Sequence, residues 1–231
     1  MSAPIAIFHH SVFCAPDGSL WPAAPAIIAS QMDALRRSGI LDFASVVVCG
    51  INGGSESRCL ASALLPPQAR LIYHGLESRN ENSTLAALED WLPRHRHYHV
   101  LYHHAKGATH TPGERKGTIW RNCMTRHLIK NWRRCVTDLD AGHEVVGCHF
   151  MRPPLTPGNQ HIFAGNWWFA KASFLATLPS IRSTARVKLS GLGALDSRYE
   201  AETWIGNGPR LPRIKDYHGP SWHPGFIDSC I

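Results

Sequence analysis

The sequence predicts an α/β protein with a Rossmann-type, mainly parallel central sheet flanked by helices. Short apolar runs rich in β-branched residues recur along the first half of the chain, and segments with helical spacing separate them. The 231 residues are 44% hydrophobic and 18% charged, which is too apolar for a disordered chain. This length is typical of one large α/β domain, so we expect a single domain spanning residues 1–231.

The expected elements of the first half alternate regularly. Strands are predicted at residues 5–8, 45–51, 70–74 and 99–103, and helices at 27–41 and 84–92, the latter capped by Asn82 or Ser83. His9, His10 and Ser11 are expected in a loop after the first strand. Open parallel sheets bind ligands at the carboxyl ends of their strands. Functional residues are therefore expected directly after each strand.

The second half changes character. An amphipathic helix is predicted over 117–139 and a strand over 144–148, followed by an aromatic stretch over 161–170. Short helices are expected at 172–178 and 199–205. Four prolines in the last 25 residues favour a tail that wraps over the domain.

Several classes of protein are excluded by composition. No apolar run approaches the roughly 20 residues that span a bilayer, and residues 1–13 lack the features of a signal peptide. We therefore expect a soluble, cytoplasmic protein. Seven cysteines without a Cys-x-x-Cys pair favour neither a disulfide framework nor a zinc ribbon.

The net charge of +7 and the 15 histidines leave two alternative functions open. One is a basic nucleic-acid-binding module, and the other is a His-ligated metalloenzyme. Six histidines crowd into residues 95–110. On one strand His97 and His103 would lie about 20 Å apart, because a strand rises about 3.3 Å per residue, so they cannot ligate one ion.

Two further segments carry residues suited to chemistry. After the fourth strand, Lys106 beside Gly107 suits a phosphate, since the ammonium supplies charge and the glycine lets backbone N–H groups approach. Asn166 beside Trp167 supplies an amide and flat apolar faces, which suit a sugar or a nucleobase.

Two carboxylates lie among aromatic residues near the end of the sequence. Glu200 and Glu202 stand two residues apart on a predicted helix, so they point about 200° away from each other. At most one of them faces a given pocket, where it could act as a general base. The sequence supports equally the alternative that both carboxylates are solvated charges on the surface of the helix.

Four motifs together resemble those of a known family. They are Tyr102-His103-His104-Ala105-Lys106-Gly107, then Trp120-Arg121 with Met124, then the run from His161 to Ala170, and finally Glu202-x-Trp204-Ile205. They are similar to the patterns His-[Ser/Thr]-Lys-Gly, Trp-Arg, His-x-Ser-Gly-Asn-Phe-Trp-Trp-Ala and Glu-x-Trp-Ile of a group of GT-A-like glycosyltransferases. That group includes bacterial polysaccharide enzymes and the rhamnosyltransferase-like domain of large algal viruses.

The resemblance implies a GT-A-like fold and a hexosyl- or deoxyhexosyltransferase of polysaccharide biosynthesis. Residues 1–110 would form the nucleotide-binding half and 111–231 the acceptor and catalytic half. The partners implied are a UDP-, GDP- or dTDP-sugar donor and a glycan or lipid-linked acceptor. A lipid-linked acceptor is compatible with peripheral membrane association, and no nucleic acid partner is expected.

The resemblance also implies roles for individual residues. Glu202 would be the general base of an inverting transfer, with Glu200 as the reserve candidate. The donor would be bound by His9, Ser11, Glu77, Asn80, His103, His104, Lys106 and Gly107. The sugar or acceptor site would contain Arg121, His161, Gly165, Asn166 and Trp167. For Arg121 and His161 the resemblance leaves two roles open, contact with the leaving phosphates or contact with the acceptor.

The sequence departs from the family pattern in two respects. Most GT-A enzymes end the fourth strand with an Asp-x-Asp that holds Mn²⁺ or Mg²⁺, whereas His103-His104-Ala105 stands here, so the metal requirement stays open. Ala105 and Ala164 replace hydroxyl-bearing residues of the patterns.

Overall fold

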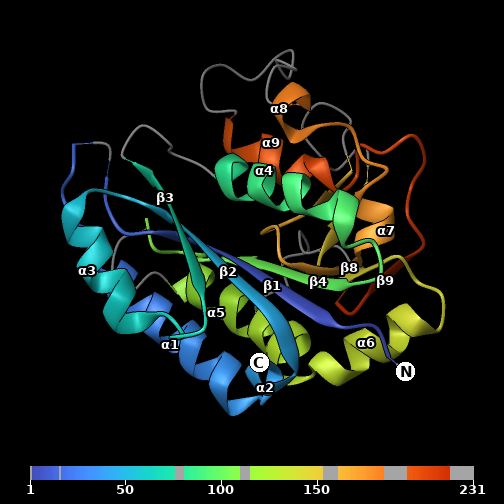
Figure 1. The fold of residues 1–231 in the computed structure, drawn as a ribbon, viewed down its shortest axis with the longest axis horizontal. Coiled ribbons are helices and arrows are strands. Elements are labelled where there is room, and N and C mark those ends of the chain that lie inside the picture. The colour runs from blue at the N-terminus through green and yellow to red at the C-terminus, as the bar shows by residue number, and fades with distance from the viewer. Residues whose placement is uncertain are drawn as a thin grey trace.

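The chain folds around one mixed, mainly parallel sheet of seven strands, which confirms the predicted α/β class (Figure 1). The computed structural model describes residues 2–15, 17–75, 81–109, 115–152, 161–184 and 197–218. Across the sheet the strands run in the order β3-β2-β1-β4-β8-β5-β9. Their bounds are β1 Ile5–Val12, β2 Ala44–Asn52, β3 Arg70–Gly75, β4 His99–His104, β5 Val145–Gly147, β8 Trp168–Lys171 and β9 Ile214–Asp216.

The order of the strands reverses at β1. The chain builds β2 and β3 outward on one side of β1 and then returns to place β4 on the other side, with all four strands parallel. β8 runs antiparallel to both β4 and β5. A small second sheet pairs β6 (Phe150–Met151) with β7 (Ile162–Phe163). In open α/β sheets such a reversal is the place where ligands bind.

Helices cover both faces of the sheet (Figure 1). On one face lie α1 (Ala24–Arg37), α2 (Ile40–Phe43), α3 (Ser55–Leu64), α5 (Arg115–Met124), the π-helical segment η2 (Thr125–Lys130) and α6 (Trp132–Asp140). On the other lie α4 (Asn82–Trp91), η1 (Leu92–Arg94), α7 (Ala172–Leu175), α8 (Ile181–Thr184) and α9 (Ser197–Trp204).

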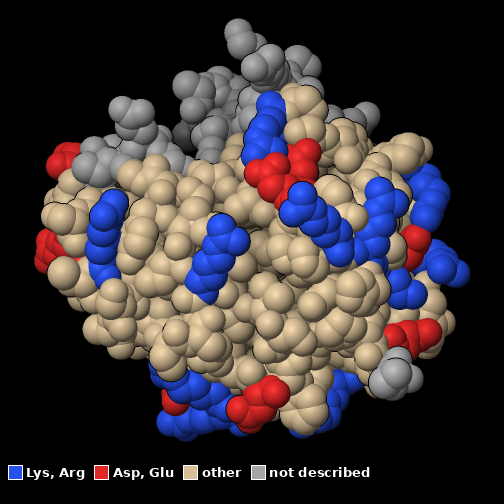
Figure 2. All heavy atoms as spheres, in the orientation of Figure 1, with Lys and Arg blue, Asp and Glu red and all other residues tan. Residues whose placement is uncertain are grey.

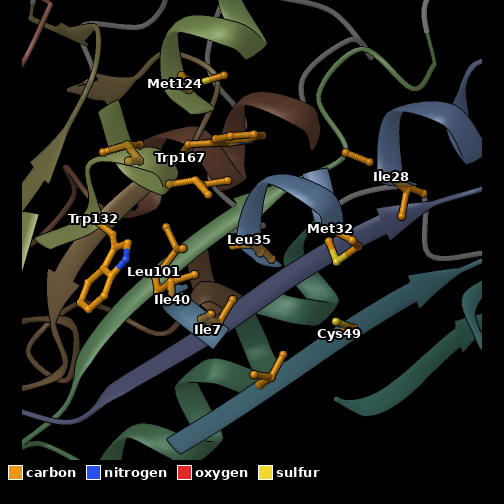
Figure 3. Close-up of a cluster of buried hydrophobic side chains, with 14 of the residues drawn as sticks. Ile7, Ile28, Met32, Leu35, Ile40, Cys49, Leu101, Met124, Trp132 and Trp167 are labelled. Carbon is orange, nitrogen blue, oxygen red and sulfur yellow. The ribbon is translucent and has the colours of Figure 1, made fainter. Parts of the chain in front are cut away.

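Each face of β1 contributes to a different hydrophobic core. Ile7 packs with α1 in a cluster that includes Met32 and Leu35 (Figure 3). Phe8 packs into the second cluster, beneath α4 and α9. Successive side chains of a strand point to opposite faces. Further along β1, His9 and His10 therefore enter the two faces separately.

The first half differs from the sequence predictions in three ways. The first strand extends to Val12, so His9, His10 and Ser11 lie in the strand and not in a loop. The helix expected at 27–41 is divided, because Gly39 takes a positive φ of 72° between α1 and α2. α3 was not predicted, because it follows a glycine pair that indicated only a turn, and of its residues only Ser57 and Ala61 are buried.

Further differences lie in the second half and at the start of α4. The helix expected at 117–139 is interrupted, because α5 continues as the π-helical segment η2 and the chain leaves helical geometry at Asn131. Part of the expected tail, Ile214–Asp216, is instead strand β9 at the edge of the sheet. Asn82 and Ser83, one of which was expected to cap α4, are the first two residues of that helix, and Glu81 occupies the N-cap position.

The surface shows no concentration of charge on the face in Figure 2. Lys and Arg side chains are dispersed there, with Asp and Glu between them. In the described ranges, no helix is both long and apolar enough to cross a bilayer. The six cysteines of these ranges form no disulfide with one another.

We predict that Gly147→Ala lowers the free energy of unfolding by about 1–3 kcal/mol, the usual cost of overpacking a core. A Cβ at Gly147 would lie 2.5 Å from the ring of Phe163, which is fully buried. Chemical denaturation measures the loss. In the double variant Gly147→Ala, Phe163→Leu the smaller side chain relieves the clash, so the combined loss is smaller than the sum of the two single losses. Strict additivity would contradict this packing.

Candidate functional site

Four histidines meet at the reversal point of the sheet. β1 and β4 pair in parallel register so that His9 lies beside His103 and His10 beside His104. His103 and His104 are the last residues of β4, and His9 and His10 directly precede the last two residues of β1, so all four lie toward the carboxyl edge. The site therefore stands where an open α/β sheet places its ligands.

His9 and His103 form a buried pair of neutral imidazoles on the α1 face. Their Nδ1 atoms lie 3.2 Å apart, so one ring donates its single Nδ1 hydrogen to the other. Burial lowers the pKa of His103 to about 3 and that of His9 well below its ordinary value. Both rings are therefore uncharged at neutral pH.

Several buried polar atoms beside this pair have no hydrogen-bond partner in the described part of the chain. They are Nε2 of His9, Nε2 of His103, Oγ of Ser11 and Nε1 of Trp167. Leaving such an atom unsatisfied costs about 1–3 kcal/mol, so water or a ligand is expected to bind there.

His104 lies on the α4 face of the sheet and forms a hydrogen bond with Glu81. Its Nε2 lies 2.8 Å from the carbonyl oxygen of Gly165, so Nε2 carries hydrogen and donates it. Its Nδ1 faces Oε1 of Glu81 at 3.3 Å. Burial raises the pKa of Glu81 to about 7, whereas burial and the charge of Lys106 lower the pKa of His104 to about 3. The proton between them accordingly resides on Glu81, which donates to Nδ1.

The second carboxyl oxygen of Glu81 joins this dyad to β4 and β8. Oε2 accepts hydrogen bonds from the hydroxyl of Tyr102 and the amide of Asn166, each at 2.8 Å. Asn166 in turn accepts from Nε1 of Trp168 at 2.9 Å. Asn166 has a positive φ of 46° in the turn before β8. Glu81 thus fixes the conformation of the turn that carries Gly165 and Asn166.

A second polar chain holds the start of α4 against the sheet. Nδ1 of His10 lies 2.8 Å from the hydroxyl of Thr84, which also lies 3.3 Å from Nε2 of His74. Gly50 leaves room for it, because a Cβ there would come within 1.9 Å of Thr84 Oγ1. The helix that begins after Glu81 is therefore anchored on both sides of the reversal point.

Cationic groups gather where the chain leaves β4. The ammonium of Lys106 lies 4.4 Å from the ring centre of Trp120, and no carboxylate of the described residues forms an ion pair with it. Arg121 donates to the carbonyl oxygen of Lys106 at 3.0 Å. Gly107 turns with a positive φ of 86°, close against Arg121. Two positive charges thus flank a bent backbone that suits an anion.

The site residues expected from the sequence fall into three groups. The structure brings together His9, Ser11, His103, His104, Lys106, Gly107, Arg121, Gly165, Asn166 and Trp167 around the ends of β1 and β4. Glu77 and Asn80 lie outside the described residues, as does the side chain of Glu200. Asn166 and Trp167 are fully buried, so their contact with a sugar stays a prediction.

His161 and Glu202 lie on adjoining elements of the α4 face. α9, which carries Glu202, packs against β7 and α4. Its end lies on the backbone of His161 so closely that a Cβ at Gly206 would come within 2.1 Å of the His161 carbonyl oxygen. Glu202 is 7% exposed. Through β7 these residues connect to the turn of Gly165.

Glu81 was missed by the sequence analysis. Glu81 occupies the N-cap position of α4. An acidic side chain there ordinarily accepts a hydrogen bond from a backbone N–H of the first helical turn, but Glu81 forms no such cap. The feature of the sequence that could have identified Glu81 is an acidic residue in the segment after the third strand, where functional residues were expected.

A pocket of about 400 Å³ opens between α1 and the α5–η2 segment. Its walls include Asp33 and Arg37 of α1, which form an ion pair with each other, and Arg121 and Lys130 of the α5–η2 segment. Gln31 also lines it and donates to the carbonyl oxygen of His104 at 3.0 Å. The pocket therefore borders the end of β4 from the α1 face.

The resemblance raises the question of Mn²⁺ or Mg²⁺ at the end of β4. Such cations prefer carboxylate, carbonyl and water oxygens. The strand ends in imidazoles, and the oxygens of Glu81 already accept from Tyr102 and Asn166 and face His104. This donor set does not fit a hard divalent cation.

Comparison with known proteins gives a family match over most of the chain. Residues 10–212 match the family described as a domain of unknown function, DUF8361. A search of curated proteins found no match.

Two solved structures are similar in fold. One is a 4-diphosphocytidyl-2C-methyl-D-erythritol synthase, with a TM-score of 0.41 and 11% identity over 82% of each chain. The other is the synthase of that name from Anaerococcus prevotii, with a TM-score of 0.48 and 10% identity over 99% of this chain and 94% of that one. Likenesses at this level do not bear on activity.

We predict that the free energy of unfolding falls as the pH drops below about 6.5. The folded state keeps His9 and His103 neutral, whereas the unfolded chain binds protons there, which costs about 1.4 kcal/mol per pH unit for each proton. Glu81 acts in the opposite direction: its folded pKa of about 7 exceeds 4.5, so its contribution is present at low pH and lost as the pH rises through 7.

Urea unfolding between pH 4.5 and 7.5 tests this balance. His103→Gln should take up about one proton fewer on unfolding near pH 5 than the parent chain. His97→Gln, at an exposed position, is the matched control for loss of a histidine. An unchanged pH slope in His103→Gln would show that this imidazole is not held neutral.

Proposed function

The chain belongs to the DUF8361 family, and we propose that it is a nucleotide-sugar-dependent glycosyltransferase. It moves a hexosyl or deoxyhexosyl residue from a UDP-, GDP- or dTDP-sugar to a hydroxyl of a glycan or lipid-linked acceptor. The observation that carries the proposal is the cationic turn of Lys106 and Gly107 at the reversal point of the sheet. The motif resemblance adds the sugar chemistry.

The diphosphate of the donor is proposed to bind at this turn. Lys106 has its ammonium on the face of Trp120, from where it can reach an anion without breaking an ion pair within the described residues. Arg121 lies beside it. Because a departing nucleoside diphosphate gains negative charge, these groups stabilise the transition state more than the ground state.

Glu81 and Asn166 are proposed to act as positioning residues. Both side chains are engaged with each other, so their polar groups hold the Gly165 turn in place. The carbonyl oxygen of Gly165 accepts from His104, which keeps the turn against the end of β4. A sugar attached to the diphosphate would lie over this turn.

Glu202 is proposed as the general base, with Glu200 in reserve. Its carboxylate takes the proton of the acceptor hydroxyl as that oxygen forms a bond to the anomeric carbon. The bond from the anomeric carbon to the diphosphate oxygen breaks in the same displacement, and the electron pair leaves with the diphosphate. Direct displacement inverts the anomeric configuration.

We predict that Glu202→Gln lowers transfer by roughly 10²–10⁴-fold, the range of general base catalysis, and leaves donor binding intact. Transfer is measured with a panel of UDP-, GDP- and dTDP-sugars, and donor binding by calorimetry. Glu81→Leu is the contrasting variant: it removes the acceptor of Tyr102 and Asn166 and the donor to His104, so it should weaken donor binding together with turnover. Wild-type turnover in Glu202→Gln would exclude Glu202 as the base, and failure of every nucleotide to bind would contradict the function itself.

We further predict that transfer needs no added Mn²⁺ or Mg²⁺, because Lys106 and Arg121 supply the charge that an Asp-x-Asp metal supplies elsewhere. Lys106→Met, which keeps the length of the side chain, should lower turnover by roughly 10²–10³-fold. Rates are compared with and without each added ion. A rate that appears only with Mn²⁺ or Mg²⁺ would contradict this assignment of charge.

A further inference from the structure

A cluster of metal-ligating side chains lies next to Trp120, whose ring centre is 5.8 Å from that of His149 and 4.4 Å from the ammonium of Lys106. We propose that Cys123, His149 and His218 bind one Zn²⁺ ion. Their ligand atoms all lie within 4.8 Å of one another, and theirs is the group of this kind found in the described residues. They come from α5, from the turn between β5 and β6, and from the residue two positions after β9.

The spacing is close to that of a tetrahedral site. Zinc bonds of about 2.3 Å to sulfur and 2.0–2.1 Å to nitrogen place neighbouring ligand atoms roughly 3.4–3.8 Å apart. Ligand atoms that lie within 4.8 Å reach this spacing by rotamer shifts of about 1 Å or less. Three protein ligands leave the fourth position to a water molecule.

The donor types favour zinc over the hard cations. Thiolate and imidazole are soft or borderline ligands, which select Zn²⁺ and bind Mn²⁺ or Mg²⁺ poorly. Cys123 and His149 are buried and His218 is half-buried, so the ion would be largely shielded from solvent. Cys148, whose thiol is hydrogen-bonded to Cys123, is not part of the converging group.

Asp216 organises the two segments that carry the histidines. Its Oδ1 accepts the backbone N–H of His149 at 3.0 Å and that of His218 at 3.1 Å, and its Oδ2 accepts the N–H of Phe150 at 2.9 Å. One carboxylate therefore holds both imidazole-bearing segments at the same end of the sheet. These hydrogen bonds hold the backbone of both ligand-bearing segments in place, which is what a preformed binding site requires.

His149 is held in a strained conformation. Its φ is 63°, in the left-handed region that a histidine rarely adopts. Such strain persists where the surroundings dictate it, and it concentrates at ligand sites. Here it turns the ring of His149 toward that of His218, with 4.9 Å between the ring centres.

A zinc ion at this position would link three separate segments of the fold. α5 carries Cys123 and also Trp120 and Arg121, the partners of Lys106. An ion bound to Cys123 would tie α5 to the β5–β6 turn and to the end of β9. The proposed zinc site does not rest on the proposed transfer reaction.

The test uses the full chain without an affinity tag, stripped by chelator and titrated with Co²⁺ and Zn²⁺. Cobalt should bind one equivalent per chain, with the thiolate-to-metal charge-transfer band of a cysteine ligand, and zinc should displace it. Cys123→Ser should lose that band, and His149→Asn and His218→Gln should weaken binding by at least about 10-fold. Asparagine tolerates the left-handed φ at position 149, so that variant keeps the backbone.

Matched controls are Cys59→Ser and His127→Gln. Cys59 is exposed, and the ring of His127 lies 6.2 Å from that of His218 without belonging to the cluster. Both variants should keep one equivalent of metal and the charge-transfer band. Zn²⁺ should also raise the Tm of the stripped parent chain, which tests the site even where a ligand variant fails to fold. Absence of the band and of any Tm shift in the parent, or equal loss in the controls, would overturn the proposal.

Discussion

The parallel register of β1 with β4 is the constraint on which the rest of the site depends. It sets His9 against His103 and His10 against His104 at the point where the strand order reverses. Because neighbouring side chains of a strand point to opposite faces, this one pairing distributes the imidazoles to both cores. A shift of one residue would exchange the faces and leave the polar groups without their present partners. The strand register that builds the two hydrophobic cores therefore also determines which side chains meet at the carboxyl edge of the sheet.

Glu81 converts this strand pairing into a connected site. Its carboxyl group contacts Tyr102 and His104 of β4 and Asn166 of the turn before β8, so the parallel half and the antiparallel half of the sheet share one buried group. Burial keeps its proton up to about pH 7 and keeps the surrounding imidazoles neutral. The cations of the site are thus confined to the rim, at Lys106 and Arg121, where an anionic ligand would meet them.

Much of the fold and part of the site could be predicted from the sequence. Apolar runs located the four parallel strands, and the rule for their carboxyl ends singled out Lys106 and Gly107. The role of Glu81 could not be predicted, because it depends on partners 21 and 85 residues away. Cys123, His149 and His218 are similarly far apart in sequence and meet only through the tertiary fold. The break at Asn131 arises from a π-helical segment, whose altered period leaves little trace in an amphipathic pattern. The crowding of histidines in residues 95–110 also has a tertiary explanation, since His99 pairs with Asp140 and His103 with His9.

The end of β4 is proposed to be the place where a nucleoside diphosphate binds. Hydrogen–deuterium exchange of the full chain with UDP, GDP or dTDP tests that location directly. We predict that the nucleotide that binds slows exchange of the backbone amides of residues 103–109 and 165–167, while the α1 amides that line the 400 Å³ pocket change little. Protection confined to α1 and η2, with the end of β4 unaffected, would contradict it.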